Sequence, residues 1–447
     1  MCLRLLLTLA LAASGVAFAG SLTSADWEEV LGPSLGSWPT GQTEVVWRED
    51  FGAALGEARD SGRPLFVTLR CLPCKQCSDF DKSVLEAGGT LDLYLRQFIT
   101  VRITDAAQLD LARLPAPGYQ DFDLSWWGYF LSPQAELYGI FGGRDEISDT
   151  TRISELALAN NLSRVLDHHY DPRRSTWKVD GAPVASELAS VSPRKLPGHD
   201  TWLAGDPWAQ TQTCLHCHQI ADVLRQEQMD AGRFDKPSAV KIWPLPENVG
   251  LSLDRDHGLQ VKAVEKGSAA EKIGLQVGDE LGAAGGHRPF GQADFRGVLH
   301  RLANPSGSIE LVWLRDGAVH TGEFKLKQGW RSTVLDWRMS ISQGVIGADP
   351  GFFPLKGNCP DGKRNAMAVK PYWGKHAKQS PAFRAGLRPN HVILAVDGES
   401  PPKDGRGFLV WFRLRYEFGD KVRFTVAEKG KTRDIEVKLA PRDPVTG

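Results

Sequence analysis

The chain has 447 residues, which at about 150 residues per domain predicts roughly three domains rather than one. Its composition, with 42% hydrophobic and 24% charged residues, is that of a folded protein. A formal net charge of −1 gives no electrostatic basis for binding nucleic acid or an anionic membrane surface, and we expect neither partner.

The N-terminus has the pattern of a secretory signal peptide. Arg4 precedes a largely apolar run from Leu5 to Ala13, and Ala17-Phe18-Ala19 forms an A-x-A cleavage site before Gly20. The run is too short to span a bilayer, and no later stretch reaches the length of a spanning helix. We expect residues 1–19 to be removed, leaving an exported protein of the periplasm or cell envelope without an integral membrane segment. A short N-terminal anchor is the alternative.

Five of the six cysteines that follow the signal fall into two tight clusters. A disulfide scaffold would spread its cysteines along the chain, so clustering indicates redox or cofactor chemistry instead. Cys359 stands alone, and we expect it to be a loop or core thiol. The clustered residues are Cys71, Cys74, Cys77, Cys214 and Cys217.

Residues 45–170 carry a regular order of elements: helix, strand, helix, strand, hairpin, helix. This order resembles the thioredoxin fold, in which a strand ends just before a cysteine pair that opens a helix. The elements are a helix through Phe51, Leu55 and Ala58, a strand at Leu65–Leu69, a helix near Phe80, a strand at Phe98–Ile103, a hairpin of Trp127–Leu131 and Leu137–Phe141, and a helix from Ile153 to near His169.

The first cluster, Cys71-Leu-Pro-Cys74-Lys-Gln-Cys77, holds two overlapping C-x-x-C motifs. A helix N-terminus stabilises a thiolate, and a second thiol at this spacing can resolve a mixed disulfide. Cys71 and Cys74 resemble the Cys-Gly-Pro-Cys-Lys of thioredoxins, whereas the ten residues from Pro64 to Cys74 match the usual family spacing. We expect a redox pair with Cys74 as the shared member and Cys77 as its partner. A structural disulfide and a three-thiol metal site are the alternatives.

One departure from thioredoxins concerns the strand beside the dithiol. Thioredoxins place a cis-proline there, just before the hairpin, and this chain has Trp126-Trp127 instead. We therefore expect substrate docking to differ from that of thioredoxins, or to be absent.

Residues 171–242 are Pro-rich and polar, and we expect a linker or a small cofactor-bearing segment. It contains a C-x-x-C-H motif, in which Cys214 and Cys217 can form thioethers to a c-type haem and His218 can bind its metal as axial ligand. The alternatives are zinc, bound by both thiols with His216 or His218, and a plain disulfide. Candidates for the sixth ligand of a haem are Met229, His199 and Met339.

The C-terminal half contains an internal repeat. Gly267-Ser-Ala-Ala270 leads to Ile273-Gly-Leu275 and Val277-Gly-Asp-Glu-Leu281, and a second copy runs from Gln379 to Gly398. Each resembles the bacterial PDZ signature G-S-P-A-x-x-A-G-L-x-x-G-D-x-I, although Asn390 stands in the second copy where the first has Asp279. We expect PDZ-like domains over 243–328 and 335–441, with no protease domain beside them.

PDZ domains add the C-terminal strand of a peptide to a sheet edge and bind its carboxylate through backbone N–H groups. In the first unit the matching loop is Val249-Gly250-Leu251-Ser252-Leu253, and in the second Gln343 to Gly347 is a weaker match. We expect these units to bind the C-termini of proteins or peptides. The alternative is that they are spacers that pack within the chain.

The whole order resembles an exported bacterial family that joins a thioredoxin-like domain to PDZ domains and includes selenoproteins. The expected fold class is therefore an α/β thioredoxin-like domain followed by two mainly β PDZ-like domains. The expected function is thiol–disulfide exchange with a redox partner protein, together with haem-mediated electron transfer. A non-catalytic envelope scaffold with structural cysteines is the rival.

Overall fold

The structure of the protein is a computed structural model. It describes residues 22–70, 75–86, 88–111, 114, 120–122, 124–144, 153–177, 179–180, 191–205, 209–211, 214–239, 243–302, 307–332, 347–354, 371–372, 377–403 and 405–441. Within these residues no helix is long and apolar enough to cross a membrane. The expected signal peptide lies outside them.

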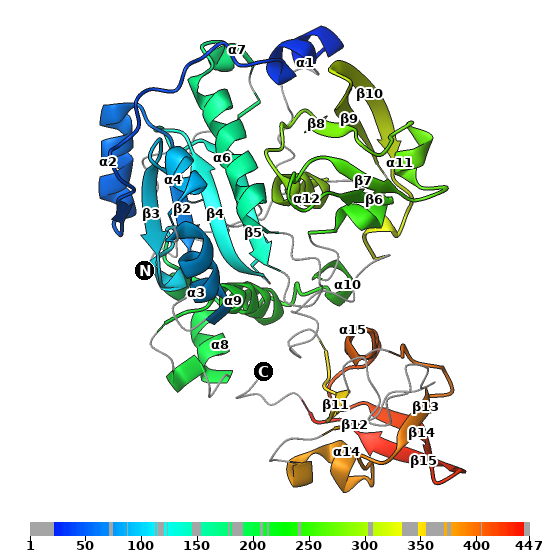
Figure 1. The fold of residues 1–447 in the computed structure, drawn as a ribbon. Coiled ribbons are helices and arrows are strands. Elements are labelled where there is room, and N and C mark those ends of the chain that lie inside the picture. The colour runs from blue at the N-terminus through cyan, green and yellow to red at the C-terminus, as the bar shows by residue number, and fades with distance from the viewer. Residues whose placement is uncertain are drawn as a thin grey trace, which may run out of the picture.

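A five-stranded mixed sheet forms the N-terminal part, in the order β1-β3-β2-β4-β5 (Figure 1). The strands β1, β3 and β2 run parallel, while β4 and β5 are antiparallel to their neighbours. This arrangement confirms the expected thioredoxin-like fold. The strands are β1 (Trp47–Arg48), β2 (Leu65–Leu69), β3 (Ile99–Ile103), β4 (Ser125–Leu131) and β5 (Leu137–Arg144).

The central strand β2 is buried along its whole length because both faces of the sheet are covered. Phe66 points into a cluster on one face, and its neighbours Leu65 and Val67 point into a cluster on the other. The elements that supply these layers are α2 (Phe51–Ser61), α3 (Lys75–Phe80), the π-helix η1 (Asp81–Leu85), α4 (Thr90–Leu95), the 3-10 turn η2 (Ala106–Gln108) and α6 (Glu155–Tyr170).

The segment expected to be a linker instead packs on the sheet. Trp202, Leu215 and Ile220 are buried in the same apolar cluster as Leu69 of β2. Hydrophobic periodicity does not indicate this packing, because most of the helices are too short to show a period. They are α7 (Arg174–Trp177), η3 (Pro193–Lys195), α8 (His199–Gly205), η4 (Ala209–Thr211), α9 (Cys217–Asp230) and α10 (Lys236–Ala239).

The first repeat forms a three-stranded antiparallel sheet, β10-β9-β8, with a separate pair of strands, β6 and β7. Asp279 accepts a hydrogen bond from the Gln276 N–H at 2.8 Å and pairs with Arg315, which explains its place in the motif. The elements are η5 (Pro246–Val249), β6 (Leu251–Leu253), β7 (Val261–Val264), α11 (Ala269–Lys272), β8 (Glu280–Ala284), α12 (Gln292–Arg301), β9 (Ser308–Arg315), β10 (Ala318–Lys325) and η6 (Trp330–Ser332).

The second repeat builds the same kind of sheet, β13-β14-β15. Counted from the Gly-Leu that both copies share, His391 rather than Asn390 takes the place of Asp279, and its Nδ1 accepts a hydrogen bond from the Arg388 N–H at 3.2 Å, as Asp279 does from Gln276. These small antiparallel sheets are consistent with the expected PDZ-like domains. The elements are β11 (Phe353–Pro354), β12 (Pro371–Tyr372), η7 (Ala377–Gln379), α14 (Pro381–Arg384), β13 (Val392–Val396), α15 (Gly405–Arg415), β14 (Lys421–Glu428) and β15 (Lys431–Lys438).

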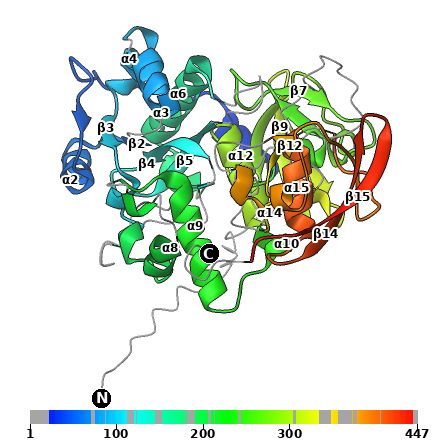
Figure 2. The ribbon, with the colours of Figure 1, turned by 90° about the horizontal axis from the view of Figure 1, so that it is seen from below.

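The first PDZ-like unit is joined tightly to the thioredoxin-like part, as the view from below also shows (Figure 2). Its helix α12 lies along β5, the edge strand of the sheet. Asp294 of α12 accepts a hydrogen bond from the Ile140 N–H of β5 at 2.6 Å. A covering helix is one way in which proteins protect an exposed sheet edge.

An N-terminal helix, α1 (Ser24–Leu31), reaches across to the same unit. Its Trp27 and Val30 are buried in a cluster with Ala283 of β8 and Val312 of β9. The chain therefore begins its described part on the surface of a domain that lies more than two hundred residues later in the sequence.

Candidate functional site

In the sequence, the cysteine cluster runs from just after β2 into helix α3. The Arg70 N–H donates to the Ile103 carbonyl at 2.8 Å, which continues the pairing of β2 with β3 by one residue. Cys77 lies inside α3. Cys71, Cys74 and the side chain of Cys77 lie outside the described part of the structure, so the choice between the two C-x-x-C pairs stays a prediction.

A buried carboxyl group lies one helical turn beyond Cys77. Asp81 is fully buried, and its Oδ1 accepts a hydrogen bond from Trp126 Nε1 at 3.0 Å. Its Oδ2 lies 3.0 Å from Arg70 Nε and 3.5 Å from Arg102 Nε. Burial raises the pKa of Asp81 above its usual value, although Trp126 and the two arginines act in the opposite direction.

Asp81 therefore ties together the end of β2, the strand β3, the start of β4 and the helix that carries Cys77. It is also the first residue of a π-helix, a distortion that occurs often at functional sites. No sequence motif marks this residue as part of the site. The available signal was a carboxylate on the apolar side of a helix, four residues after a cysteine.

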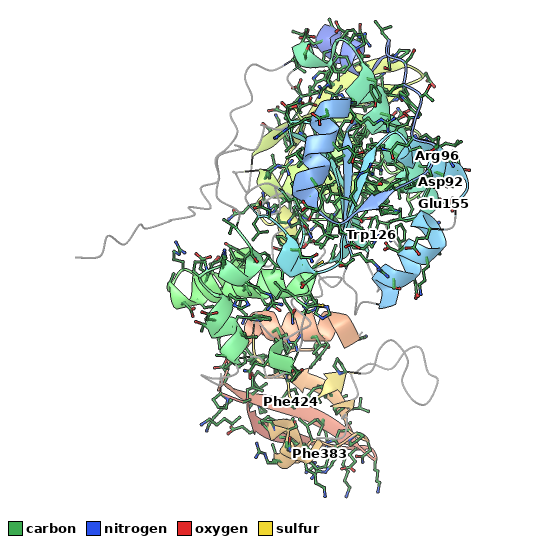
Figure 3. All side chains as sticks on the ribbon, turned by 90° about the vertical axis from the view of Figure 1, so that its left-hand side faces the viewer. Asp92, Arg96, Trp126, Glu155, Phe383 and Phe424 are labelled. Atoms are coloured by element: carbon green, nitrogen blue, oxygen red, sulfur yellow. The ribbon has the colours of Figure 1, made fainter. Side chains whose placement is uncertain are left out.

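Trp126 occupies the place where thioredoxins have a cis-proline. Its φ of +60° is unusual for a bulky residue, and its indole packs on Phe80 with ring centroids 4.5 Å apart. Figure 3 marks Trp126 within the thioredoxin-like part. No cis peptide bond occurs among the described residues. The strand beside the dithiol is thus shaped by an aromatic side chain bound to Asp81.

The C-x-x-C-H motif begins α9 and is docked on the segment that follows β3. The Leu215 N–H donates to Asp105 Oδ1 at 3.0 Å, and the Ala106 N–H donates to the Leu215 carbonyl at 3.2 Å. Cys217 is the first residue of α9, and the side chain of Gln219 accepts from the His216 N–H at 2.7 Å. The motif is therefore part of the thioredoxin-like core rather than of a separate segment.

The surroundings of this motif do not fit a covalent haem. Cys217 is only 3% exposed and belongs to the same apolar cluster as Tyr129 and Ile220, so its thiol is enclosed by protein side chains. The His218 imidazole is 36% exposed and lies 3.9 Å from Asp222. No step of the proposed function is therefore assigned to a haem.

Met229, one of the three candidates for the sixth ligand, lies on the same helix as His218. His218 and Met229 lie on the continuous helix α9, where eleven residues correspond to about 16 Å along the axis. One iron cannot bind both. His199 lies on α8, where it pairs with Asp200 at 3.0 Å, and Met339 lies outside the described residues.

Zinc finds no better support among the residues that the structure describes. No three His, Cys, Asp or Glu side chains in these ranges are grouped so that they could hold a metal ion. Cys214 and Cys217 thus do not form the alternative zinc site with His216 or with His218 among the described residues.

The expected peptide-binding loop lies at the start of the first PDZ-like unit. Val249 ends η5, and Gly250 follows with a φ of +77°. A Cβ atom at Gly250 would lie 2.1 Å from the Cβ of Ser268, so only glycine fits there. Leu251 and Leu253 are buried in the core of the unit, while Ser252 between them is half-buried.

Within the described residues β6 is paired with β7 alone, so its other edge could accept a peptide strand. The turn after β6 is held by α6 of the thioredoxin-like part. Asn160 Nδ2 donates to the Asp256 carbonyl at 2.9 Å, and Arg164 donates to the His257 carbonyl at 3.0 Å. In the second unit only Gly347 of the expected loop lies within the described residues.

Comparison with known proteins supports the first part of this picture. Residues 46–119 match the family model Thioredoxin_7, described as thioredoxin-like. This match covers the cysteine cluster, Asp81 and the strands β1 to β3. The class of domain is thus thioredoxin-like over this range.

Similar solved structures include an aminopeptidase N family protein from Idiomarina loihiensis, with 15% identity, 22% of this chain and 15% of that chain covered, and a TM-score of 0.17. They also include the HtrA-type protease AlgW with a decapeptide, with 22% identity, 29% and 40% covered, and a TM-score of 0.18. A variant of AlgW with a decapeptide gives 17% identity, 41% and 55% covered, and a TM-score of 0.20. This chain thus spans between 15% and 55% of those chains.

Proposed function

We propose that this protein is an exported thiol–disulfide exchange protein whose PDZ-like units bind the C-terminus of a client. The observation that carries the proposal is the thioredoxin-like frame around the cysteine cluster, with the cluster between β2 and α3. In the proposed reaction the thiolate of Cys74 attacks a client disulfide and forms a mixed disulfide. Cys77, or Cys71 as the alternative, then attacks that bond and releases the reduced client.

Asp81 is the proposed proton acceptor of this exchange. Residues four apart on a helix lie on the same side, so its carboxyl follows Cys77 on one face. It is buried, and burial raises its pKa above the usual value, which favours its protonated form more than at an exposed aspartate.

The test is the reduction of insulin by the full chain with dithiothreitol as electron source. Cys74→Ser should abolish the catalysed rate, whereas Cys359→Ser, a cysteine outside both clusters, should leave it unchanged. A Cys74→Ser protein that turns over insulin at the parental rate would falsify the thiol function.

Client binding by the first unit has a matched pair of glycines for its test. Gly250 and Gly267 both have a φ of +77°, but a side chain at Gly267 would meet open space. Gly250→Ala should therefore abolish binding of a C-terminal peptide library, and Gly267→Ala should largely retain it. Equal binding by the two variants would show that the peptide binds elsewhere.

Export and haem are tested on protein matured in a periplasm with cytochrome c assembly. We expect a mature N-terminus at Gly20, and a mass that still includes Met1–Ala19 would contradict the cleavage.

We also expect no Soret band and no covalent mass increment, because Cys217 is enclosed by protein. A stained protein that loses its haem in Cys217→Ala would restore the haem hypothesis.

A non-catalytic scaffold is the second candidate, and one observation favours it. All eight residues from Gln292 to Leu299 of α12 are buried, so the first PDZ-like unit packs within the chain as a spacer would. The insulin assay separates the two candidates, because a scaffold would show no rate that depends on Cys74.

A further inference from the structure

Both cysteine motifs are attached to one short stretch of backbone after β3. Arg70, the residue before Cys71, donates to the Ile103 carbonyl, and Leu215, which follows Cys214, is bound through Asp105 and Ala106. The two attachment points, Ile103 and Ala106, are three residues apart, and three residues of extended chain span at most about 10 Å. The C-x-x-C-H motif is therefore held at the sheet edge where β2 runs into the first cluster.

Asp105 makes this attachment specific. Its Oδ1 accepts the Leu215 N–H at 3.0 Å and the Ala107 N–H at 2.8 Å, so the same carboxylate caps η2 and holds the motif. The carbonyl of Leu215 accepts in return from Ala106. Leu215 is 3% exposed. The residue next to Cys214 is therefore held by hydrogen bonds of its backbone and by burial of its side chain.

Helix α9, which begins within the motif, packs closely against α8. A Cβ atom at Gly198, just before α8, would lie 2.4 Å from the Val223 carbonyl oxygen of α9, so the two helices meet there without an intervening side chain. Cys217 at the start of α9 is buried, while Cys214 is half-buried. Of the two thiols, Cys214 is thus the more exposed.

We propose that Cys214 and Cys217 form a second redox pair, which exchanges electrons with the Cys71–Cys77 cluster of the same chain. This inference rests on the proposed thiol function of that cluster. In the exchange, a thiolate of the reduced cluster attacks the Sγ of Cys214 in the Cys214–Cys217 disulfide. That bond breaks, the Cys217 thiolate leaves and takes up a proton, and a mixed disulfide joins Cys214 to the cluster.

A second cysteine of the cluster then loses its proton and attacks the mixed disulfide. The cluster becomes a disulfide and Cys214 leaves as a thiolate, which takes up that proton. Two electrons and two protons have moved from the cluster to the C-x-x-C pair, and the reverse reaction follows the same path. A dithiol reductant such as dithiothreitol reloads whichever pair reacts with it.

The test traps the mixed disulfide by removing the leaving thiol. In Cys217→Ser, Cys214 cannot close its own disulfide, so the bond to the cluster should accumulate during mild oxidation. Trypsin then separates the partners, because residues 71–75 carry Cys71 and Cys74, residues 76–82 carry Cys77, and residues 196–225 carry Cys214. Mass spectrometry without reduction should find residues 196–225 linked to one of the two cluster peptides; a link to residues 76–82 identifies Cys77, and fragmentation of a link to residues 71–75 distinguishes Cys71 from Cys74.

Asp105 supplies the control for docking. Asp105→Ala should lower the yield of the linked peptide several-fold, whereas Asp105→Asn, which keeps an acceptor oxygen, should retain it. Cys359→Ser should have no effect on the yield.

The failures of the two proposals are distinguishable. If the Cys217→Ser protein reduces insulin in a Cys74-dependent manner but yields no linked peptide, the internal exchange is wrong and the function of the cluster stands. If insulin reduction does not depend on Cys74, the function of the cluster fails and the exchange fails with it.

Discussion

The two PDZ-like units carry the same sequence signature in different surroundings. In the first, α12 lies between its own sheet and β5 of the thioredoxin-like part, and Arg296 of α12 pairs with the buried Asp121 at 3.2 Å. The second unit keeps its apolar cluster, with Phe408 and Phe424, to itself. Figure 3 marks Phe424 and Phe383 in that unit, away from Trp126.

The difference comes from residues outside the shared motif. When the buried Phe295 and Phe408 are aligned, Asp294 and Arg296 of the first unit correspond to Gly407 and Leu409 of the second. The polar side chains that bind the thioredoxin-like part are therefore found in one copy alone. A repeated motif specifies the fold of each unit, and a few positions on one helix decide whether that unit is built into a larger body.

The largest effect is expected at α1, which contacts the first unit but not the second. Trp27→Ala removes an indole that is 1% exposed beside Ala283 and Val312, and burial of this kind is worth about 3–5 kcal/mol. Urea unfolding should lose that amount in the transition of the first unit and keep the transition of the second. Leu35→Ala, at a side chain that is 67% exposed, is the control and should change neither.

Asp294→Ala should have the next largest effect. It leaves the Ile140 and Phe290 N–H groups without their acceptor in a buried interface, at a cost of about 2–4 kcal/mol. The same urea experiment measures this loss of stability, and Asp60→Ala, at an exposed residue of α2, is the control. A loss below about 0.5 kcal/mol would mean that the two parts are not held together through this carboxyl group.

The pH dependence of Asp294 sharpens the comparison further. Burial raises its pKa to about 7, so the folded state retains a proton that the unfolded chain releases near pH 4. The protonated carboxyl of Asp294 therefore contributes to the free energy of unfolding at low pH, and this contribution is lost as the pH rises through about 7. Wild type should become less stable relative to Asp294→Asn between pH 5 and pH 8.

This comparison with the asparagine variant is needed because the neighbouring histidines act in the opposite direction. Burial lowers the pKa of His168 and of His287, whose pKa falls to about 3. Their contribution is present at neutral pH and is lost as the pH falls below about 6.5. Because both variants contain these histidines, the difference between them reports Asp294. A difference that stays constant across this range would contradict the raised pKa.

The smallest effect is expected where α10 meets the second unit. Lys236 Nζ lies 2.7 Å from Glu417 Oε1 and donates to the Tyr416 carbonyl at 3.1 Å. Glu417 is exposed, and ion pairs of this kind contribute less than about 1 kcal/mol. Lys236→Ala should thus shift the unfolding of the second unit only slightly. A loss as large as that of Asp294→Ala would show that this unit is also built into the body.

Most of the fold was predictable from local patterns. Apolar runs and turn residues that lie close together in the sequence predict the strand Leu65–Leu69, the hairpin of β4 and β5 and both motif repeats. The structure places these elements as expected.

The contacts between distant segments were not predictable. Nothing near Asp294 in the sequence indicates that its carboxyl group would bind Ile140, and nothing near Asp105 points to Leu215. At the site, the cysteine spacing was informative, but Asp81 depends on Arg70, Arg102 and Trp126, which come from three different strands or strand ends. Such sites arise from tertiary packing, which a single sequence does not display.

The position of α1 also constrains the order in which the chain can fold. Trp27 lies in a cluster with Val312 and beside Val319 of β10, so its place does not exist until the ribosome has added nearly three hundred further residues. Contacts of such long sequence separation close slowly, because loop closure must precede the gain from packing. Helix α1 is therefore expected to be among the last elements to dock, and a chain that stops before β9 would lack Val312 and Val319, two of the side chains that pack with the cluster of Trp27.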